Sequence, residues 1–402
     1  MNRLTISLLT LVASALALPA AAQESVLYSF NPQPDGNPQG RLLLDKSSLF
    51  GITEGLGGSD GTVFELKQSG GSWTESTPVT FDGTNGAYPA AGLIADSSGN
   101  LYGTTSSAGT YNGGTLFELT KSKGGWTQQT LWYFGNTAIH DGVSPLCDLI
   151  MDSTGAIYGT TEQGGTSNMG TVFKLTNSGG AWTESILYNF AGGADGELPV
   201  AGLAMDSSGA LYGTTYYGGG SSACNSGCGT VFQLGQTGGV WAETVLHAFG
   251  KGTDGQFPNG GPLVLDSSGA LYGTTGSGGT DDLGTVYALM PSGRKWKEKI
   301  LHAFTGSTDG YGPNGIIMTK SGTMYGTTLL GGAHDGGTIY ALVRSSGSWT
   351  KSDVYDFAGS SGDGFFPEAG VILDKKTQSL FGVTTQGGTD GFGAVYQVVL
   401  PR

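Results

Sequence analysis

The tetrapeptide Tyr-Gly-Thr-Thr, or a close variant, recurs seven times along this chain of 402 residues. Successive copies start between 52 and 60 residues apart, at Phe50, Tyr102, Tyr158, Tyr212, Tyr272, Tyr325 and Phe381. A repeat of this length, with turn residues between short apolar runs, is typical of the blades of a β-propeller. Because the repeat runs almost from end to end, we predict a single domain, a closed ring over residues 23–402.

The fourth repeat shows four short apolar runs, at residues 203–206, 211–215, 230–234 and 241–249. The runs are rich in β-branched and aromatic side chains and are bounded by Gly, Asp, Asn or Ser, which predicts strands. We name the four strands of a repeat A, B, C and D in chain order. Six of the seven Trp residues begin strand D, so we expect their rings to pack between neighbouring blades. The predicted fold is all-β, with seven four-stranded blades.

The two ends of the chain complement each other. Residues 25–30 resemble strand D of later repeats, such as residues 186–190, whereas the last repeat has a strand C at 394–399 and no strand D after it. We therefore predict that the N-terminal strand completes the last blade, which pairs two edges that would otherwise be exposed.

The first 22 residues are typical of an export signal. Arg3 provides the positive start, residues 4–18 are mostly apolar, and residues 20–22 form a small-residue cleavage site. We expect a secreted or periplasmic monomer. No later segment approaches 18 apolar residues, so we expect no membrane insertion.

Outside the cytoplasm the environment is oxidising. Two cysteines in one loop, Cys224 and Cys228, therefore predict a disulfide.

The charge balance argues against nucleic acid as a partner. The chain carries 32 acidic and 18 basic residues, a formal net charge of −14, and charged residues make up 12% of it. A polyanion would be repelled by this field.

The strand order places the A–B and C–D turns on one face of the ring and the D–A and B–C loops on the other. We assign all of the length variation to the second set, and function concentrates in variable loops on a rigid frame. We expect a site there.

The D–A loops carry Asp-Gly, two residues and then Pro, with Asn85 replacing Asp in the second repeat; the acids are Asp35, Asp141, Asp195, Asp254, Asp309 and Asp363.

Two interpretations of these acids stay open. Asp-Gly before Pro is a turn sequence, so the seven copies fit an architectural role. Alternatively, carboxylates such as Asp195, Asp254 and Asp309 bind a ligand or Ca²⁺. No Asp-x-Asp-x-Asp segment supplies several oxygen ligands at once, so we predict no metal site and no cofactor.

Aromatic residues accompany the acids on the same predicted face. They are Tyr88, Tyr111, Tyr216, Tyr217, Phe257, Tyr311 and Phe365. Aromatic rings beside polar groups suit sugars, whose C–H faces pack on the rings while their hydroxyls form hydrogen bonds. The alternative is that the rings fill gaps between blades. Our leading hypothesis is an exported module that binds an extracellular polysaccharide or a protein ligand.

A polysaccharide-cleaving enzyme is the second hypothesis, and the question of catalysis stays open. His140 precedes Asp141, and Asp148 stands where Gly92 and Gly202 occur, near the inner end of strand A. These three residues provide candidates for an acid and a base at the mouth of the channel. A protein-interaction scaffold of the cell envelope is the third hypothesis.

The combination of Leu-Tyr-Gly-Thr-Thr, Gly-Gly, Gly-Thr-Val-Phe-x-Leu and Trp resembles the GloVer tandem repeat of exported bacterial proteins. The resemblance covers about residues 25–399. The pattern is also similar to a distant kelch repeat, with Gly164-Gly165, Phe173 and Trp182 in the places of the Gly-Gly, aromatic and Trp positions. The resemblance implies an exported propeller of undefined activity, and it transfers no catalytic residue.

Overall fold

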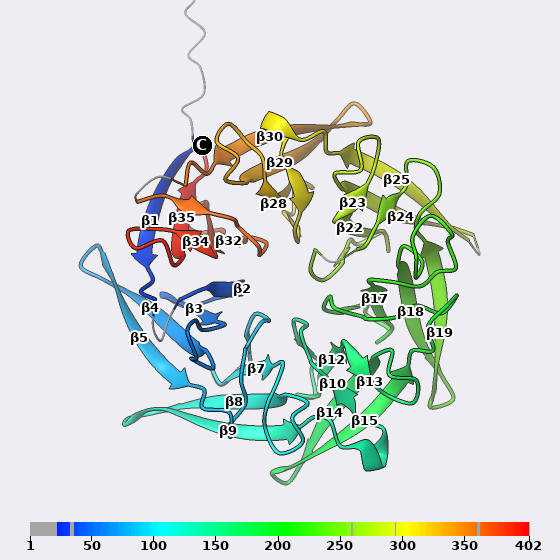
Figure 1. The fold of residues 1–402 in the computed structure, drawn as a ribbon, viewed down its shortest axis with the longest axis horizontal. Coiled ribbons are helices and arrows are strands. Elements are labelled where there is room, and N and C mark those ends of the chain that lie inside the picture. Colours follow the sequence, from blue (N-terminus) through cyan, green and yellow to red (C-terminus); the bar gives the residue numbers. More distant parts are fainter. Residues whose placement is uncertain (1–21, 33–35, 259, 294, 360–361, 402) are drawn as a thin grey trace, which may run out of the picture.

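A computed structural model describes residues 22–32, 36–258, 260–293, 295–359 and 362–401. It shows a ring of seven four-stranded antiparallel sheets around a central channel (Figure 1). The all-β, seven-bladed prediction is therefore confirmed. The predicted signal segment lies outside the described residues except for Ala22. Among the described residues, no helix has the length and apolar character needed to span a membrane.

The strands of each blade run outward from the channel in the order A to D. Blade 1 contains β2 (Pro38–Asp45), β3 (Ser48–Thr53), β4 (Thr62–Ser69) and β5 (Ser72–Thr80); blade 2 contains β6 (Ile94–Ala95), β7 (Leu101–Thr105), β8 (Thr115–Ser122) and β9 (Gly125–Tyr133). Blade 3 contains β11 (Ile150–Met151), β12 (Ile157–Thr161), β14 (Thr171–Ser178) and β15 (Ala181–Asn189); blade 4 contains β16 (Ala204–Met205), β17 (Leu211–Thr215), β18 (Thr230–Thr237) and β19 (Val240–Ala248).

Blades 5 to 7 repeat this order. Blade 5 contains β21 (Val264–Leu265), β22 (Leu271–Thr275), β24 (Thr285–Ser292) and β25 (Lys295–Ala303); blade 6 contains β27 (Ile317–Met318), β28 (Met324–Leu330), β29 (Thr338–Ser345) and β30 (Ser348–Asp356). Blade 7 contains β32 (Ile372–Asp374), β33 (Ser379–Thr384), β35 (Ala394–Val399) and β1 (Gln23–Ser29).

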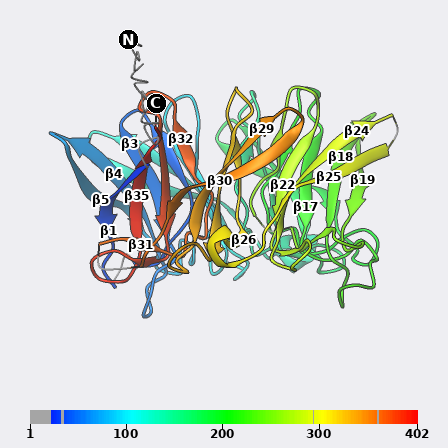
Figure 2. The same cartoon turned by 90° about the horizontal axis from the view of Figure 1, so that it is seen from above.

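Short elements in the D–A and B–C loops form one face of the disc (Figure 2). They are β10 (Gly142–Val143) with β13 (Gln163–Gly164), β20 (Gly255–Gln256) with β23 (Ser277–Gly278), β31 (Gly364–Phe365) with β34 (Gln386–Gly387), and β26 (Tyr311–Pro313), which pairs with β28. Two 3-10 turns, η1 (Thr137–Ile139) and η2 (Ser307–Asp309), lie in D–A loops. These pairs tie the D–A loops that lead into blades 3, 5, 6 and 7 to the B–C loops of the same blades.

The fourth repeat shows where the predicted strand boundaries were right and where they were not. Strand B was predicted at the observed residues, strand C extends three residues further, and strand D begins and ends one residue earlier. Strand A was predicted too long. Asp206 leaves the ladder because its carboxylate Oδ1 accepts the backbone N–H groups of Ser208 and Ala210 at 2.8 and 3.0 Å. This acid therefore builds the A–B turn.

The Tyr and Gly of the repeated tetrapeptide serve packing. Tyr212 of β17 meets Trp296 of the next blade edge-on, with ring centroids 6.4 Å apart. This contact confirms the predicted inter-blade position of the strand D Trp residues. Gly213 follows, and a Cβ atom there would lie 2.6 Å from Phe232 Cζ on the paired strand β18. Glycine is therefore required for the aromatic ring to cross strand B.

The two Thr residues form hydrogen bonds in two directions. Thr215 Oγ1 lies 2.8 Å from Oγ1 of Thr230, the first residue of strand C. Thr160 Oγ1 in blade 3 donates to the carbonyl of Ala201 in blade 4 at 3.2 Å. The tetrapeptide thus joins strands B and C within a blade and joins the blade to its neighbour.

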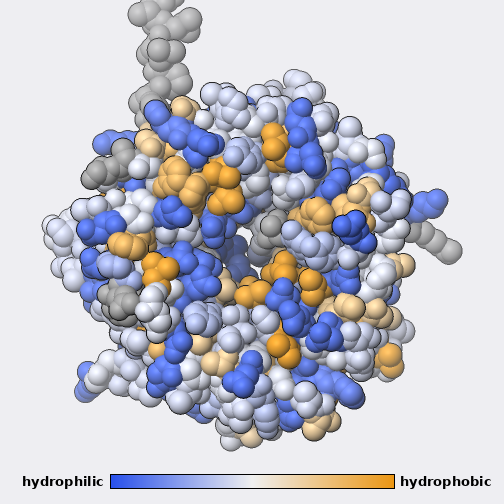
Figure 3. All heavy atoms as spheres, in the orientation of Figure 1, coloured by the Kyte–Doolittle hydropathy of each residue, from blue (hydrophilic) through white to orange (hydrophobic). Residues whose placement is uncertain are grey.

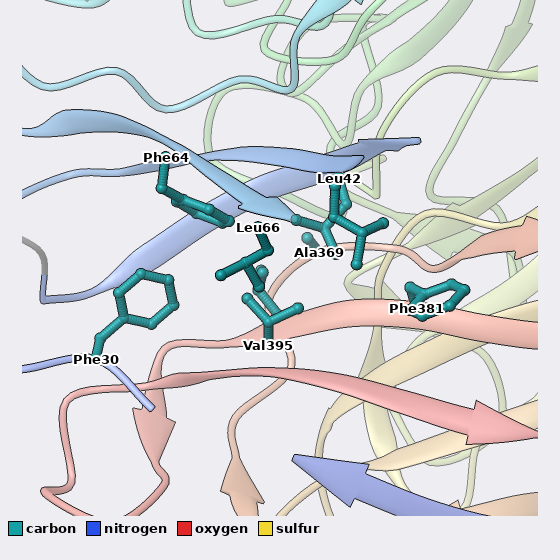
Figure 4. Packing of buried hydrophobic residues seen from close by; sticks show 9 residues of the cluster. Phe30, Leu42, Phe64, Leu66, Ala369, Phe381 and Val395 are labelled. Atoms are coloured by element: carbon teal, nitrogen blue, oxygen red, sulfur yellow. The ribbon is translucent and has the colours of Figure 1, made fainter. Parts of the chain in front are cut away.

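The ring closes through β1, as the sequence predicted. β1 pairs antiparallel with β35, from Gln23 opposite Val399 to Ser29 opposite Ala394. Phe30 then enters a buried cluster that contains Phe64 of blade 1 and Val395 of blade 7 (Figure 4). The strand β1 therefore belongs to the last blade, while Phe30 just after it packs against the first.

Candidate functional site

The repeated Asp of the D–A loop lies between blades, where it faces the outer strands. In three loops it faces an acid on strand D of the next blade; the pairs are Asp141 with Glu184, Asp195 with Glu243, and Asp254 with Glu298. Asp363 faces Glu24 of β1 in the same way. We call these four the inter-blade acid pairs. The glutamates share one register position, opposite the fifth residue of strand C, at Leu175, Leu234, Leu289 and Val398.

These glutamates are poorly hydrated. In each of the four, Oε1 is buried and has no hydrogen-bond donor among the described residues. Burial, and then the neighbouring Asp charge, raises the pKa of Glu24 and Glu243 to about 7. Burial and the Asp141 carboxylate also raise the pKa of Glu184 well above its ordinary value. Each glutamate therefore keeps its proton to a higher pH than an exposed carboxyl group does, since burial and a neighbouring negative charge both disfavour its ionised form.

We expect the thermal stability of the protein to fall between about pH 5 and pH 9. The pKa of these glutamates is higher in the folded chain than in the unfolded chain, so folding retains protons that unfolding releases as the pH rises. Glu184→Gln removes one such group, and its melting temperature should fall less steeply over this range. Melting curves at fixed ionic strength test this. Glu162→Gln, in the B–C loop of the same blade, is the control, and equal pH slopes for both variants would contradict the assignment.

A third side chain contacts the acid in several of these interfaces. Tyr188 donates its hydroxyl to Asp195 Oδ1 at 2.7 Å, whereas His247 and His302 place Nε2 3.0 Å from an oxygen of Asp254 and of Asp309, respectively. The loop acids are thus engaged with their own blade as well as with the next one. This arrangement supports the architectural interpretation of the Asp-Gly-x-x-Pro loops. Asp35 lies outside the described residues.

The predicted aromatic ligand residues are spread around the disc rather than joined in one site. Tyr88 and Tyr111 are the most exposed, at 42% and 49%. Tyr216, Tyr217 and Phe257 pack on one another, with Tyr216 stacked on Phe257 at a centroid distance of 5.1 Å. The remaining two are half-buried: Tyr311 in β26 and Phe365, which contacts Phe366.

A disulfide links Cys224 and Cys228 in the B–C loop of blade 4. The backbone N–H of Phe257 donates to the carbonyl of Cys228 at 2.9 Å, so the bridged loop supports the Tyr216, Tyr217 and Phe257 cluster. Cys147 is a buried free thiol, and burial raises its pKa to about 11. It is therefore protonated and unreactive at neutral pH.

A pocket of about 310 Å³ opens at the rim between blades 2 and 3. We call it the rim pocket, and its lining residues are Tyr111, Leu131, Trp132, Tyr133, Asn136 and Trp182. Tyr111 comes from a B–C loop and Asn136 from a D–A loop, while Trp132 and Tyr133 end β9. Among these residues the sequence singled out Tyr111 alone as a ligand contact. Trp132 could have been noticed in the sequence, because it is the one Trp that does not lie at the start of strand D.

A second cavity, of about 170 Å³, lies in the central channel where the D–A loops enter strand A. Figure 3 shows the channel opening, with apolar and polar side chains alternating around it. Asp148 lines this cavity, accepts the N–H of Gly92 at 2.8 Å and lies 3.5 Å from a guanidinium nitrogen of Arg41. Glu368 is exposed in the same cavity.

The structure does not assemble the three residues that were proposed as a catalytic group. Asp141 is buried beside Trp132 and Glu184 of the outer strands, whereas Asp148 lies at the inner strand. His140 is exposed at the end of η1 and does not line the channel cavity. Of the three proposed residues, only Asp148 lines the channel cavity.

The sequence profile of a family described as "Gloeobacter/Verrucomicrobia repeat" matches residues 16–226 and 221–401. No curated protein matches the sequence. Among solved structures, the polysaccharide lyase Uly1 is similar with a TM-score of 0.54 at 10% identity, covering 93% of this chain and 92% of that one. A proposed 6-phosphogluconolactonase from Bacteroides uniformis is similar with a TM-score of 0.53 at 14% identity, covering 84% and 89%. At these identities the similarity shows the fold alone.

Proposed function

The chain belongs to the Gloeobacter/Verrucomicrobia repeat family, and from its geometry we propose an exported carbohydrate-binding module whose sugar site is the rim pocket. The observation that carries the proposal is the lining of this pocket, where four aromatic side chains surround one opening beside Asn136. Rings of this kind pack on the C–H faces of a sugar, and an amide bonds its hydroxyls.

The size and charge of the rim pocket favour a neutral sugar. Its volume of about 310 Å³ lies at the lower end of the range for small-molecule sites, which suits one or two sugar rings at the end of a chain. Its lining residues include no Asp, Glu, Lys or Arg. A uronic acid would find no cation there, whereas a neutral hexose needs only apolar faces and hydrogen-bonding groups.

We expect Tyr111→Ala to weaken binding of a neutral oligosaccharide about tenfold or more. Removal of an aromatic contact at the centre of a site costs about 1–2 kcal/mol, and 1.4 kcal/mol is tenfold. A glycan array identifies the ligand, and isothermal titration then compares the variants. Because Tyr111 is about half exposed, the fold should not depend on it.

Tyr88→Ala is the matched control, since Tyr88 is equally exposed in the D–A loop that leads into blade 2 and does not line the rim pocket. An array that stays silent for the wild type, or equal losses in both variants, would count against the rim pocket as a sugar site.

The channel cavity favours a second candidate function, cleavage of a polysaccharide chain. Asp148 and Arg41 supply a carboxylate and a cation in one cavity, and Uly1 shares the fold. Release of new chain ends by the wild type, lost in Asp148→Asn, would support catalysis there.

A further inference from the structure

One inter-blade acid pair differs from the others because a histidine joins both acids. His247 of β19 places Nε2 3.0 Å from Asp254 Oδ2 and 3.9 Å from Glu298 Oε2 of β25. A ligand atom from each of the three side chains lies within 4.8 Å of the other two. The side chains are 18%, 5% and 16% exposed. Two carboxylates and an imidazole thus converge on one half-buried point between blades 4 and 5.

This cluster lacks compensating positive charge. Glu298 Oε1 is buried without a donor, and no Lys or Arg forms an ion pair with Asp254 or Glu298 among the described residues. The fully buried Tyr287 also has a hydroxyl oxygen without a hydrogen-bond partner. Burial raises the pKa of this hydroxyl, and the charges of Glu298 and Asp254 raise it further.

The next interface shows a positive group in the corresponding place. Between blades 5 and 6 the same register position is occupied by Lys351, opposite Leu342, and its ammonium lies 3.1 Å from Asp309 Oδ1. His302 contacts the same carboxylate, as His247 contacts Asp254. The two interfaces therefore have the same His and Asp positions. They differ in the third residue, which is the cation Lys351 between blades 5 and 6 and the acid Glu298 between blades 4 and 5.

We infer that His247, Asp254 and Glu298 form a site for a divalent transition metal ion such as Zn²⁺, which joins blade 4 to blade 5. One imidazole nitrogen and two carboxylate oxygens are ligands that Zn²⁺ accepts, and the imidazole favours a transition metal over Ca²⁺ or Mg²⁺. The ion supplies the positive charge that Lys351 supplies one blade later. The inference does not depend on sugar binding.

The geometry of the cluster is close to what such an ion requires. At metal–ligand distances of about 2.1 Å, the ligand atoms of a tetrahedral site lie about 3.4 Å apart. The observed separations of 3.0 and 3.9 Å lie on either side of this value. Asp254 is oriented by the N–H of Gly255, which donates to Oδ1 at 2.8 Å and leaves Oδ2 directed at the imidazole. A water molecule would complete the coordination from the exposed side.

The test is Zn²⁺ binding by the purified full chain after treatment with a chelator. We expect one Zn²⁺ per chain by equilibrium dialysis and elemental analysis, a rise in melting temperature on Zn²⁺ addition, and Co²⁺ absorption bands typical of low coordination number. Ca²⁺ at the same concentration should not raise the melting temperature.

Two variants copy residues from other repeats, so they should fold. His247→Tyr introduces the residue found at Tyr188, and Glu298→Lys introduces the residue found at Lys351. Each should weaken Zn²⁺ binding at least about 100-fold, because one ligand is lost. Glu298→Lys should also keep the metal-free melting temperature at or above that of the wild type.

His302→Tyr is the matched control, since it changes the same residue type one blade later, and its Zn²⁺ binding should equal that of the wild type. A wild-type chain that binds no Zn²⁺ would overturn the inference, and so would Zn²⁺ binding that survives both His247→Tyr and Glu298→Lys. In that case a protonated His247 bridges the two carboxylates.

Discussion

A chain that begins at Asn31, and therefore lacks β1, is expected to lose its cooperative unfolding transition and to aggregate. Phe30 is fully buried between blades 1 and 7, and loss of such a ring alone costs about 3–5 kcal/mol. Removal of β1 also leaves β35 as an unpaired edge from Ala394 to Val399. Since domains are stable by only about 5–15 kcal/mol, the sum of these losses is comparable to the whole stability.

Circular dichroism melts and size-exclusion chromatography measure this effect, with a chain that begins at Gln23 as the control. Phe30→Ala, which keeps the strand, should fold with a lower melting temperature. A peptide of residues 22–30 added in excess should restore a soluble ring by strand addition. A truncated chain that melts like the control would show that closure by β1 contributes little.

Phe232→Ala is expected to destabilise the protein by about 3–5 kcal/mol, because it empties a site at the centre of blade 4. The ring is fully buried and contacts Phe190 at a centroid distance of 5.2 Å. Gly213→Ala should lower the stability by about 1–3 kcal/mol because it overpacks the same region. Its methyl group would lie 2.6 Å from Phe232 Cζ and 3.0 Å from Leu203 Cδ2.

The effects of changes at Gly213 and Phe232 should be coupled. The methyl group of Gly213→Ala would occupy space that the Phe232 ring fills, and a smaller residue at position 232 leaves that space free. In a Phe232→Leu background, Gly213→Ala should cost measurably less than in the wild type, which denaturant unfolding in a double-mutant cycle detects. Gly235→Ala is the control: Gly235 lies in the same blade, and a Cβ there would meet nothing within 4 Å. Additive effects at Gly213 and Phe232, or an equal cost at Gly235, would contradict this packing argument.

The fold could be predicted because each repeat encodes the same local interactions. The Asp of the A–B turn, the Gly under the strand C aromatic ring and the paired Thr residues all act within about 30 residues of one another. In the fourth repeat the errors lay at strand ends such as Asp206, where a side chain competes with the ladder for backbone N–H groups.

The candidate sites could be predicted only in part. Tyr111 was expected on the ligand face and lines the rim pocket, but its partner Trp182 comes from the next repeat. Asp141 and Asp148 are seven residues apart in the sequence, yet one lies at the outer strands and the other in the channel. Sequence proximity in a D–A loop says little about distance, because this loop crosses the full width of a blade.

The number of blades, their strand order and the way the ring closes were determined by the sequence alone, since a periodic pattern specifies each unit and its adjacent neighbours. The pairing of Asp254 with Glu298, and of Asp309 with Lys351, was decided only by the tertiary structure. The physical reason is that a repeat shows which positions are equivalent, whereas blade twist and packing determine which positions of two adjacent blades meet. The charge environment between blades, and with it the site around His247, therefore became visible only in the folded ring.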